Sequence, residues 1–145
     1  MTGTPSVLFV CVHNAGRSQM AAALLRHHAM GRIKVQSAGS APGEQINLTA
    51  VRALQEWGID ISGLEPKKLD PHAVEQSDVV ITMGCGDACP HIRARFYDDW
   101  SLPDPSDLSP EDYSEICQTI RSRVKALLGD LGVAIDTAVA EKERT

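Results

Sequence analysis

The chain has 145 residues, of which 43% are hydrophobic and 23% are charged, and its formal net charge is −5. This is the composition of an ordinary globular protein, so we expect one domain over residues 1–145, with its core over about 6–131 and a frayed tail over 138–145. An acidic chain lacks the basic face that nucleic acids require, so we expect no nucleic-acid partner. An anionic substrate must be attracted by a local feature, because the overall charge repels it.

We expect a cytoplasmic protein with no membrane contact. Residues 1–6 carry no basic residue, the apolar run after them is too short for a secretory signal, and no segment reaches the length of a membrane span. Thiols stay reduced in the cytoplasm. The four cysteines therefore predict chemistry or packing and not a disulfide framework.

The most informative segment lies between the first predicted strand, Val7–Val10, and the first predicted helix, Ser18–Ala29. A strand, a tight loop and a helix N-terminus present backbone N–H groups and the positive end of the helix dipole, which together attract an oxyanion. The residues expected to bind this anion are Val12, His13, Asn14, Ala15, Gly16, Arg17 and Ser18.

Cys11 stands at the mouth of this loop, where positive potential favours the thiolate, the nucleophilic form of cysteine. Arg17 offers a planar fork to two oxygens of a tetrahedral anion, and Ser18 can donate a hydrogen bond to the thiolate. The alternative is a half-buried cysteine in a turn before a helix. We interpret Cys11 as a nucleophile because reactive cysteines favour electropositive helix N-termini.

Strand and helix patterns alternate along the rest of the chain. Further elements are predicted as strands at Ile33–Gln36, Asp78–Met83 and Arg95–Tyr97, a helix at Leu48–Trp57 and a short turn at Pro71–Glu75. This alternation predicts an α/β fold, a three-layer sandwich in which a four-stranded parallel sheet carries helices on both faces. Ligands of such sheets bind at the carboxyl ends of the strands, where the Cys11 loop lies.

Two more thiols, Cys85 and Cys89, follow the third predicted strand in a loop rich in Gly and Asp. The third strand is expected to end beside the first, so this loop can overhang Cys11. A mobile loop with two thiols beside a thiolate suggests a disulfide relay. The alternatives are two unreactive thiols, or half of a metal site for which His91 is the only nearby further ligand. We expect no metal and no cofactor.

Asp104 lies between Pro103 and Pro105, after the fourth predicted strand. Proline fixes backbone angles and so aims the side chain between the two rings. A carboxyl group held at the mouth of an anion site can act as general acid for a leaving oxygen. The alternative is a turn aspartate, since Pro-Asp-Pro also suits a turn. Three nearby carboxyl groups could also act as the general acid, but none of them lies between two prolines: Asp98, Asp99 and Asp107.

The last helix has the strongest boundary signals. Ser109 can cap it, Pro110 suits its first position, and Asp112 completes a capping box. Its apolar stripe comprises Tyr113, Ile116, Cys117, Ile120, Val124, Leu127, Leu128 and Leu131. Because Cys117 falls on this stripe, we expect a packed core thiol and no redox role for it.

The loop from Cys11 to Ser18, with Gln19-Met20-Ala21 after it, resembles the phosphate-binding loop of the low-molecular-weight tyrosine phosphatase fold, and more closely that of the arsenate reductases built on this fold. The likeness spans roughly residues 6–131 and includes Ser37-Ala38-Gly39, Gly58-Ile59-Asp60-Ile61-Ser62, Gln76-Ser77-Asp78, Cys89-Pro90 and Pro103-Asp104-Pro105. Phosphatases of this fold lack the Cys85/Cys89 pair and carry tyrosines just after the acid.

The resemblance implies an enzyme of arsenic detoxification that reduces arsenate to arsenite, with phosphate and sulfate as competing anions. It implies that arsenate settles against Arg17, that Cys11 attacks arsenic, and that Asp104 protonates the departing hydroxyl. Cys85 then attacks Cys11, and Cys89 attacks Cys85. The resulting disulfide is reduced by thioredoxin or a similar redoxin.

Three other functions stay open. The same nucleophile, arginine and acid could cleave a phosphomonoester, the reductase could be coupled to mycothiol or glutathione, and the thiols could serve an anion or arsenite sensor as soft ligands. Two features depart from the family pattern. The spacing from Cys85 to Cys89 is shorter than in some thioredoxin-linked members, and Ala22 stands where some members carry a potassium-binding glutamate.

Overall fold

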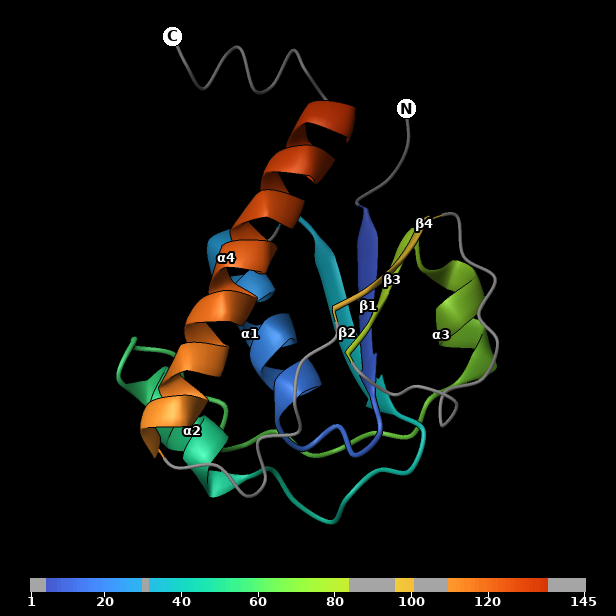
Figure 1. Ribbon diagram of the computed structural model, residues 1–145. Coiled ribbons are helices and arrows are strands. Elements are labelled where there is room, and N and C mark those ends of the chain that lie inside the picture. Colours follow the sequence, from blue (N-terminus) through green and yellow to red (C-terminus); the bar gives the residue numbers. More distant parts are fainter. Residues whose placement is uncertain (1–4, 30–31, 84–95, 101–109, 136–145) are drawn as a thin grey trace, which may run out of the picture.

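Four parallel strands form a sheet in the computed structural model, which describes residues 5–29, 32–83, 96–100 and 110–135. The strands are β1 (Ser6–Cys11), β2 (Lys34–Gly39), β3 (Val79–Thr82) and β4 (Phe96–Asp99), in the spatial order β2-β1-β3-β4 (Figure 1). All four predicted strands are confirmed. β2 runs beyond its predicted end at Gln36 because Gly39 still pairs with Cys11 of β1.

Helices cover both faces of this sheet (Figure 1). On one side, α1 (Arg17–Ala29) packs against β1 and β2, and α4 (Pro110–Ile135) packs against α1 and α2 (Leu48–Gln55). On the other side, α3 (Pro71–Gln76) packs against β1. The predicted three-layer α/β sandwich is therefore confirmed, although α2 ends before its predicted boundary at Trp57.

The segment that the sequence predicted as a turn, Pro71–Glu75, is the short helix α3. Asp70 caps it, because Asp70 Oδ1 accepts a hydrogen bond from the backbone N–H of His72 at 3.0 Å. Pro71 occupies the first helical position, where its fixed φ suits a helix. None of the six residues of α3 is fully buried, so the helix lacks the apolar periodicity by which sequence reasoning detects one.

Side chains of β1 alternate between two hydrophobic cores. Val7, Phe9 and Cys11 join the core shared with α1, α2 and α4, whereas Leu8 and Val10 join the smaller core on the side of α3. Both faces of the central strand are therefore buried. This is why the sequence of β1 is an unbroken apolar run and does not alternate between apolar and polar residues.

Helix α4 contributes most of its predicted apolar stripe to the larger core. The buried members of the stripe are Ile116, Cys117, Ile120, Val124 and Leu127, while Leu128 and Leu131 are partly buried. The capping residue Ser109 and the side chains of Asp112 and Tyr113 lie outside the described residues. Within the described ranges, no helix combines the length and the apolar character needed to cross a membrane.

Cys117 is a core thiol, as predicted. It is 1% exposed, and its Sγ lies 3.2 Å from Met20 Sδ of α1. Burial, with a smaller contribution from the charge of Glu56, raises the pKa of the Cys117 thiol to about 11. The neutral thiol is therefore strongly favoured in the folded protein at neutral pH.

We expect Cys117 to make folding pH-dependent only under alkaline conditions. An unfolded thiol ionises at a lower pH than the folded one, so its contribution to stability is complete at neutral pH and declines from about pH 9 to about pH 11. Urea unfolding of the wild type and of Cys117→Ala across this range measures the difference between them. An identical pH dependence in the two proteins would contradict the assignment.

Candidate active site

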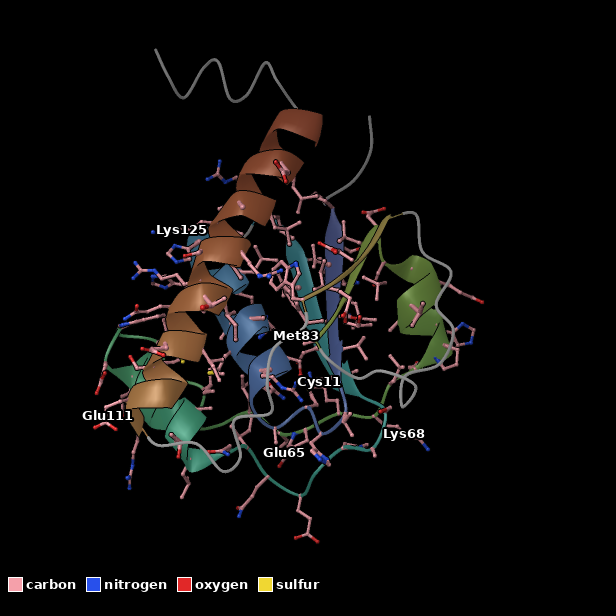
Figure 2. The ribbon with its side chains drawn as sticks, in the orientation of Figure 1. Cys11, Glu65, Lys68, Met83, Glu111 and Lys125 are labelled. Carbon is pink, nitrogen blue, oxygen red and sulfur yellow. The ribbon has the colours of Figure 1, made fainter. Side chains whose placement is uncertain are left out.

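Cys11 ends β1 at the carboxyl edge of the sheet and is 2% exposed. Its Sγ lies 2.8 Å from Ser18 Oγ and accepts a hydrogen bond from the backbone N–H of Asn14 at 3.1 Å. Figure 2 shows Cys11 at this end of β1, near Met83 and above the segment that holds Glu65. The N–H of Asn14 can only donate to the sulfur, whereas in the contact with Ser18 either atom can be the donor.

Asn14 shapes the loop after Cys11. Its φ of 51° lies in the left-handed region, which asparagine tolerates better than most residues. This conformation turns the backbone so that the N–H of Asn14 faces Cys11 Sγ, while Asn14 Nδ2 donates to Ser18 Oγ at 2.7 Å. Asn14 is fully buried. Its side chain therefore holds the loop to the first turn of α1.

The carbonyl oxygens of the loop face a neighbouring segment, residues 40–47. Four backbone hydrogen bonds join the two: Ser40 N to Cys11 O (3.1 Å), Ala41 N to Val12 O (2.8 Å), Gly43 N to His13 O (2.9 Å) and Asn47 N to Ala15 O (2.8 Å). In a trans peptide unit the next N–H points opposite to the carbonyl, and the described residues contain no cis peptide bond. The loop N–H groups that follow these carbonyls therefore point away from residues 40–47, and that of Asn14 reaches Cys11 Sγ.

Arg17 begins α1 and is 6% exposed, so its cationic side chain is held largely out of water beside the loop. The helix dipole adds positive potential at the same point. Of the other loop residues, His13 is exposed and its ring Nδ1 lies 3.3 Å from Ala41 O, whereas Val12, Ala15 and Gly16 are partly buried. Loop amides, a helix N-terminus and a buried arginine in one segment are the groups from which an oxyanion site is built.

Three contributors to this site were missed at the sequence level. Gln19 Nε2 donates to Asn14 Oδ1 at 2.9 Å, and the backbone N–H of Lys67 donates to the same oxygen at 2.8 Å. Gly39 pairs with Cys11 and allows the loop to approach β2 closely. Lys67 and Gly39 are far from the Cys11 loop in the sequence, and no local sequence pattern predicts that they contact it. In the sequence, Gln19 and the tripeptide Ser37-Ala38-Gly39 stand out only as parts of the family resemblance.

The other predicted site residues, Cys85, Cys89 and Asp104, lie outside the described residues. The structure does describe residues on either side of these two segments. Met83 N donates to Val10 O at 2.8 Å, so the chain passes beside the residue before Cys11 just ahead of the part of the sequence that holds Cys85. Trp100 N donates to Thr82 O at 2.7 Å, four positions before Asp104.

Two of the competitors for the role of general acid have partners of their own. Asp99 Oδ1 accepts a hydrogen bond from Thr82 Oγ1, and Asp98 Oδ1 accepts one from the backbone N–H of Asp99 at 2.8 Å. Both side chains therefore take part in fixing the end of β4. Among the described residues, no group of three or more His, Cys, Asp or Glu could hold a metal ion.

The parallel α/β sheet and the loop that joins Cys11 to α1 define the class of protein to which this chain belongs. The family model described as low molecular weight phosphotyrosine protein phosphatase matches residues 6–143, and the chain belongs to this family. Within the family, the chain is similar to proteins named arsenate reductase. The glutaredoxin arsenate reductase of Synechocystis sp. is 33% identical over 128 residues, which are 86% of this chain and 97% of that protein. The arsenate reductase of Bacillus subtilis is 34% identical over 69% of this chain and 73% of its own length.

The chain is also similar to solved structures of arsenate reductases. A thioredoxin-dependent arsenate reductase from Corynebacterium glutamicum is 41% identical, with a TM-score of 0.77 over 92% of this chain. The present chain spans only 64% of the length of that solved chain. An arsenate reductase in its phosphate-binding state is 31% identical, with a TM-score of 0.78 over 87% of this chain and 98% of the other. The resemblance stated from the sequence is therefore confirmed.

Proposed function

We propose that this protein reduces arsenate to arsenite with Cys11 as the nucleophile. The observation that carries the proposal is the environment of Cys11 Sγ, with Ser18 Oγ at 2.8 Å and the N–H of Asn14 at 3.1 Å inside an oxyanion loop. Similarity to proteins named arsenate reductase supports arsenate as the oxyanion. The loop N–H groups and Arg17 would hold three oxygens of the substrate, leaving the fourth as the leaving group.

In the first step, the Cys11 thiolate attacks arsenic and a bond from sulfur to arsenic forms. One oxygen leaves as water once it has received a proton, which we assign to Asp104 as general acid. The fixed N–H groups and Arg17 stabilise the charge on the remaining oxygens throughout the attack. Arsenic is still pentavalent in this covalent intermediate.

In the second step, electrons move from sulfur to arsenic. The Cys85 thiolate attacks Cys11 Sγ, a disulfide forms, and the electron pair of the sulfur–arsenic bond stays on arsenic, which leaves as arsenite. Cys89 then attacks Cys85, which frees Cys11 and leaves a Cys85–Cys89 disulfide. The hydrogen bond between Met83 and Val10 supports this order, because Cys85 is only two residues beyond Met83 in the sequence.

A dithiol redoxin would supply the two electrons that return the protein to its reduced form. The relatives are named for different reductants, thioredoxin for the Corynebacterium glutamicum protein and glutaredoxin for the Synechocystis protein. The Cys85/Cys89 pair favours thioredoxin or a similar redoxin, since an internal disulfide is the substrate that a dithiol redoxin reduces. Steady-state arsenate reduction with thioredoxin, glutaredoxin and mycothiol systems in turn identifies the reductant.

Cys85→Ser tests the relay in a single turnover without reductant. The wild-type protein is expected to release one arsenite per chain and to lose two of its four thiols. Cys85→Ser is expected to lower arsenite release to below about 1% of wild type, because no second thiolate can attack Cys11. Cys89→Ser would still release one arsenite and would stop at a Cys11–Cys85 disulfide, which peptide mass mapping detects.

The matched control for this experiment is Cys117→Ala, which removes a thiol that takes no part in the relay and is expected to leave arsenite release at the wild-type level. Undiminished arsenate reduction by Cys85→Ser would refute the proposed disulfide relay. Hydrolysis of p-nitrophenyl phosphate by the same variants distinguishes a phosphatase from a reductase, since hydrolysis needs Cys11 and does not need Cys85. A protein that hydrolyses this ester rapidly and releases no arsenite would be a phosphatase.

A further inference from the structure

Gln19 is a buried polar side chain that the proposed chemistry does not use. It is the third residue of α1, is 2% exposed and lies one position beyond Ser18. A buried amide is costly unless its hydrogen bonds are made. Both hydrogens of Gln19 Nε2 have acceptors, Asn14 Oδ1 at 2.9 Å and the backbone carbonyl of Glu65 at 3.1 Å.

Two backbone groups determine which way the amides of Gln19 and Asn14 face. The carbonyl of Glu65 can only accept, so the atom of Gln19 that faces it must be the NH₂ group. The backbone N–H of Lys67 can only donate, so the atom of Asn14 that faces it must be the oxygen. Gln19 and Lys67 thus direct two donors at Asn14 Oδ1, and the orientation of the Asn14 amide is settled by the hydrogen-bond network.

The orientation of Asn14 in turn sets the direction of the hydrogen bond to sulfur. With its oxygen held by Gln19, Asn14 presents Nδ2 to Ser18 Oγ at 2.7 Å. Since an amide NH₂ only donates, Ser18 Oγ accepts this bond and keeps its own hydrogen to donate. Cys11 Sγ lies 2.8 Å from that hydroxyl.

We propose that Gln19 is a positioning residue for the nucleophile, which orients Asn14 so that the Ser18 hydroxyl donates to Cys11 and stabilises the thiolate. A chain of donors runs from Gln19 through Asn14 and Ser18 to the sulfur, and the backbone carbonyl of Glu65 anchors its far end. The inference refers to the nucleophile of the proposed reduction, but its test needs no arsenate and so stands apart from that function.

The test is alkylation of Cys11 by iodoacetamide, followed over pH in the reduced protein. The tryptic peptide of residues 1–17 holds Cys11 as its only cysteine, so mass spectrometry reads this thiol alone. Gln19→Met keeps the length of the side chain and removes both donors. We expect it to slow alkylation at pH 7 by about 2- to 10-fold, the loss of one net hydrogen bond. The pH of half-maximal rate moves up by about 0.5 to 1 unit.

A double-mutant cycle with Ser18→Ala distinguishes positioning from a merely structural effect. If Gln19 acts through Ser18, Gln19→Met changes the alkylation rate by less than about 1.5-fold once Ser18 is alanine. An unshifted pH profile for folded Gln19→Met overturns the proposal, and so does an equal slowing in both backgrounds.

A second variant and a measurement on the wild type keep the test decisive if Gln19→Met does not fold. Gln19→Glu keeps the shape, but its carboxylate attracts Asn14 Nδ2 and repels Asn14 Oδ1, so a larger loss than with methionine is expected. In the isotope-labelled wild-type protein, NMR is expected to show slow exchange of the Gln19 side-chain amide protons with water. Rapid exchange of these protons would show that the donor chain does not exist in solution.

Discussion

Cys11→Ser is expected to abolish arsenate reduction, to below about 10⁻⁴ of the wild-type rate. A serine hydroxyl is protonated at neutral pH, so the donors around this position cannot stabilise an anion that has not formed. Sulfur is also the atom that gives up the electron pair in the proposed reduction, and oxygen cannot take this role. The rate of arsenite release with excess reductant measures the loss.

The fold and the anion site are expected to survive this substitution. Serine is smaller than cysteine and can keep the contacts to Ser18 and Asn14, so the free energy of unfolding is expected to change by no more than about 1 kcal/mol. Phosphate is expected to stabilise Cys11→Ser as it stabilises wild type, by about 2.7 kcal/mol at one hundred times its dissociation constant. Cys117→Ala is the matched control and is expected to keep full turnover. Arsenite release by Cys11→Ser would refute the assignment of the nucleophile.

The sequence predicted the local parts of this site well. The apolar run of β1, the loop at Cys11 and the start of α1 are contiguous in the chain, and each follows from the period and chemistry of neighbouring residues. The loop and the helix start therefore could be placed together at the carboxyl edge of the sheet. The short helix α3 was missed because it buries too little apolar surface to leave a helical pattern.

The parts that the sequence did not reveal depend on contacts between distant residues. Gln19 donates to the carbonyl of Glu65, which is 46 positions away, and Lys67 N donates to Asn14 Oδ1 across 53 positions. Each of these two contacts has a backbone group at one end, and every residue type except proline carries the same backbone groups. No residue pattern can therefore point to them, and only the packing of the segment around Glu65 beneath the loop brings them together.

Gly39 is the clearest of these non-local requirements. A Cβ atom at this position would lie 2.6 Å from Val12 O and 3.0 Å from both the N and the Cβ of Asn14. The first of these distances is too short for any real contact, and all three atoms belong to the oxyanion loop. Val12 O is also fixed by the N–H of Ala41 at 2.8 Å, so it cannot move aside without losing a hydrogen bond.

Gly39→Ala is therefore expected to lower the free energy of unfolding by about 2–4 kcal/mol and the Tm by about 6–15 °C. Arsenate turnover is expected to fall by about 10²-fold, because the backbone that moves belongs to the loop that we propose binds the anion. Thermal unfolding and steady-state kinetics measure the two effects, and the turnover assay must be run well below the lowered Tm.

Gly129→Ala is the control for this prediction. Gly129 lies in α4 with nothing within 4 Å of a Cβ, so alanine there is expected to stabilise the protein by up to about 1 kcal/mol through its higher helix propensity. The two substitutions add the same methyl group, and only the one beside Cys11 meets the loop. Wild-type stability and turnover in Gly39→Ala would mean that the loop can shift away from β2 without cost. In that case the tight packing of β2 against the loop would have no part in holding the anion site.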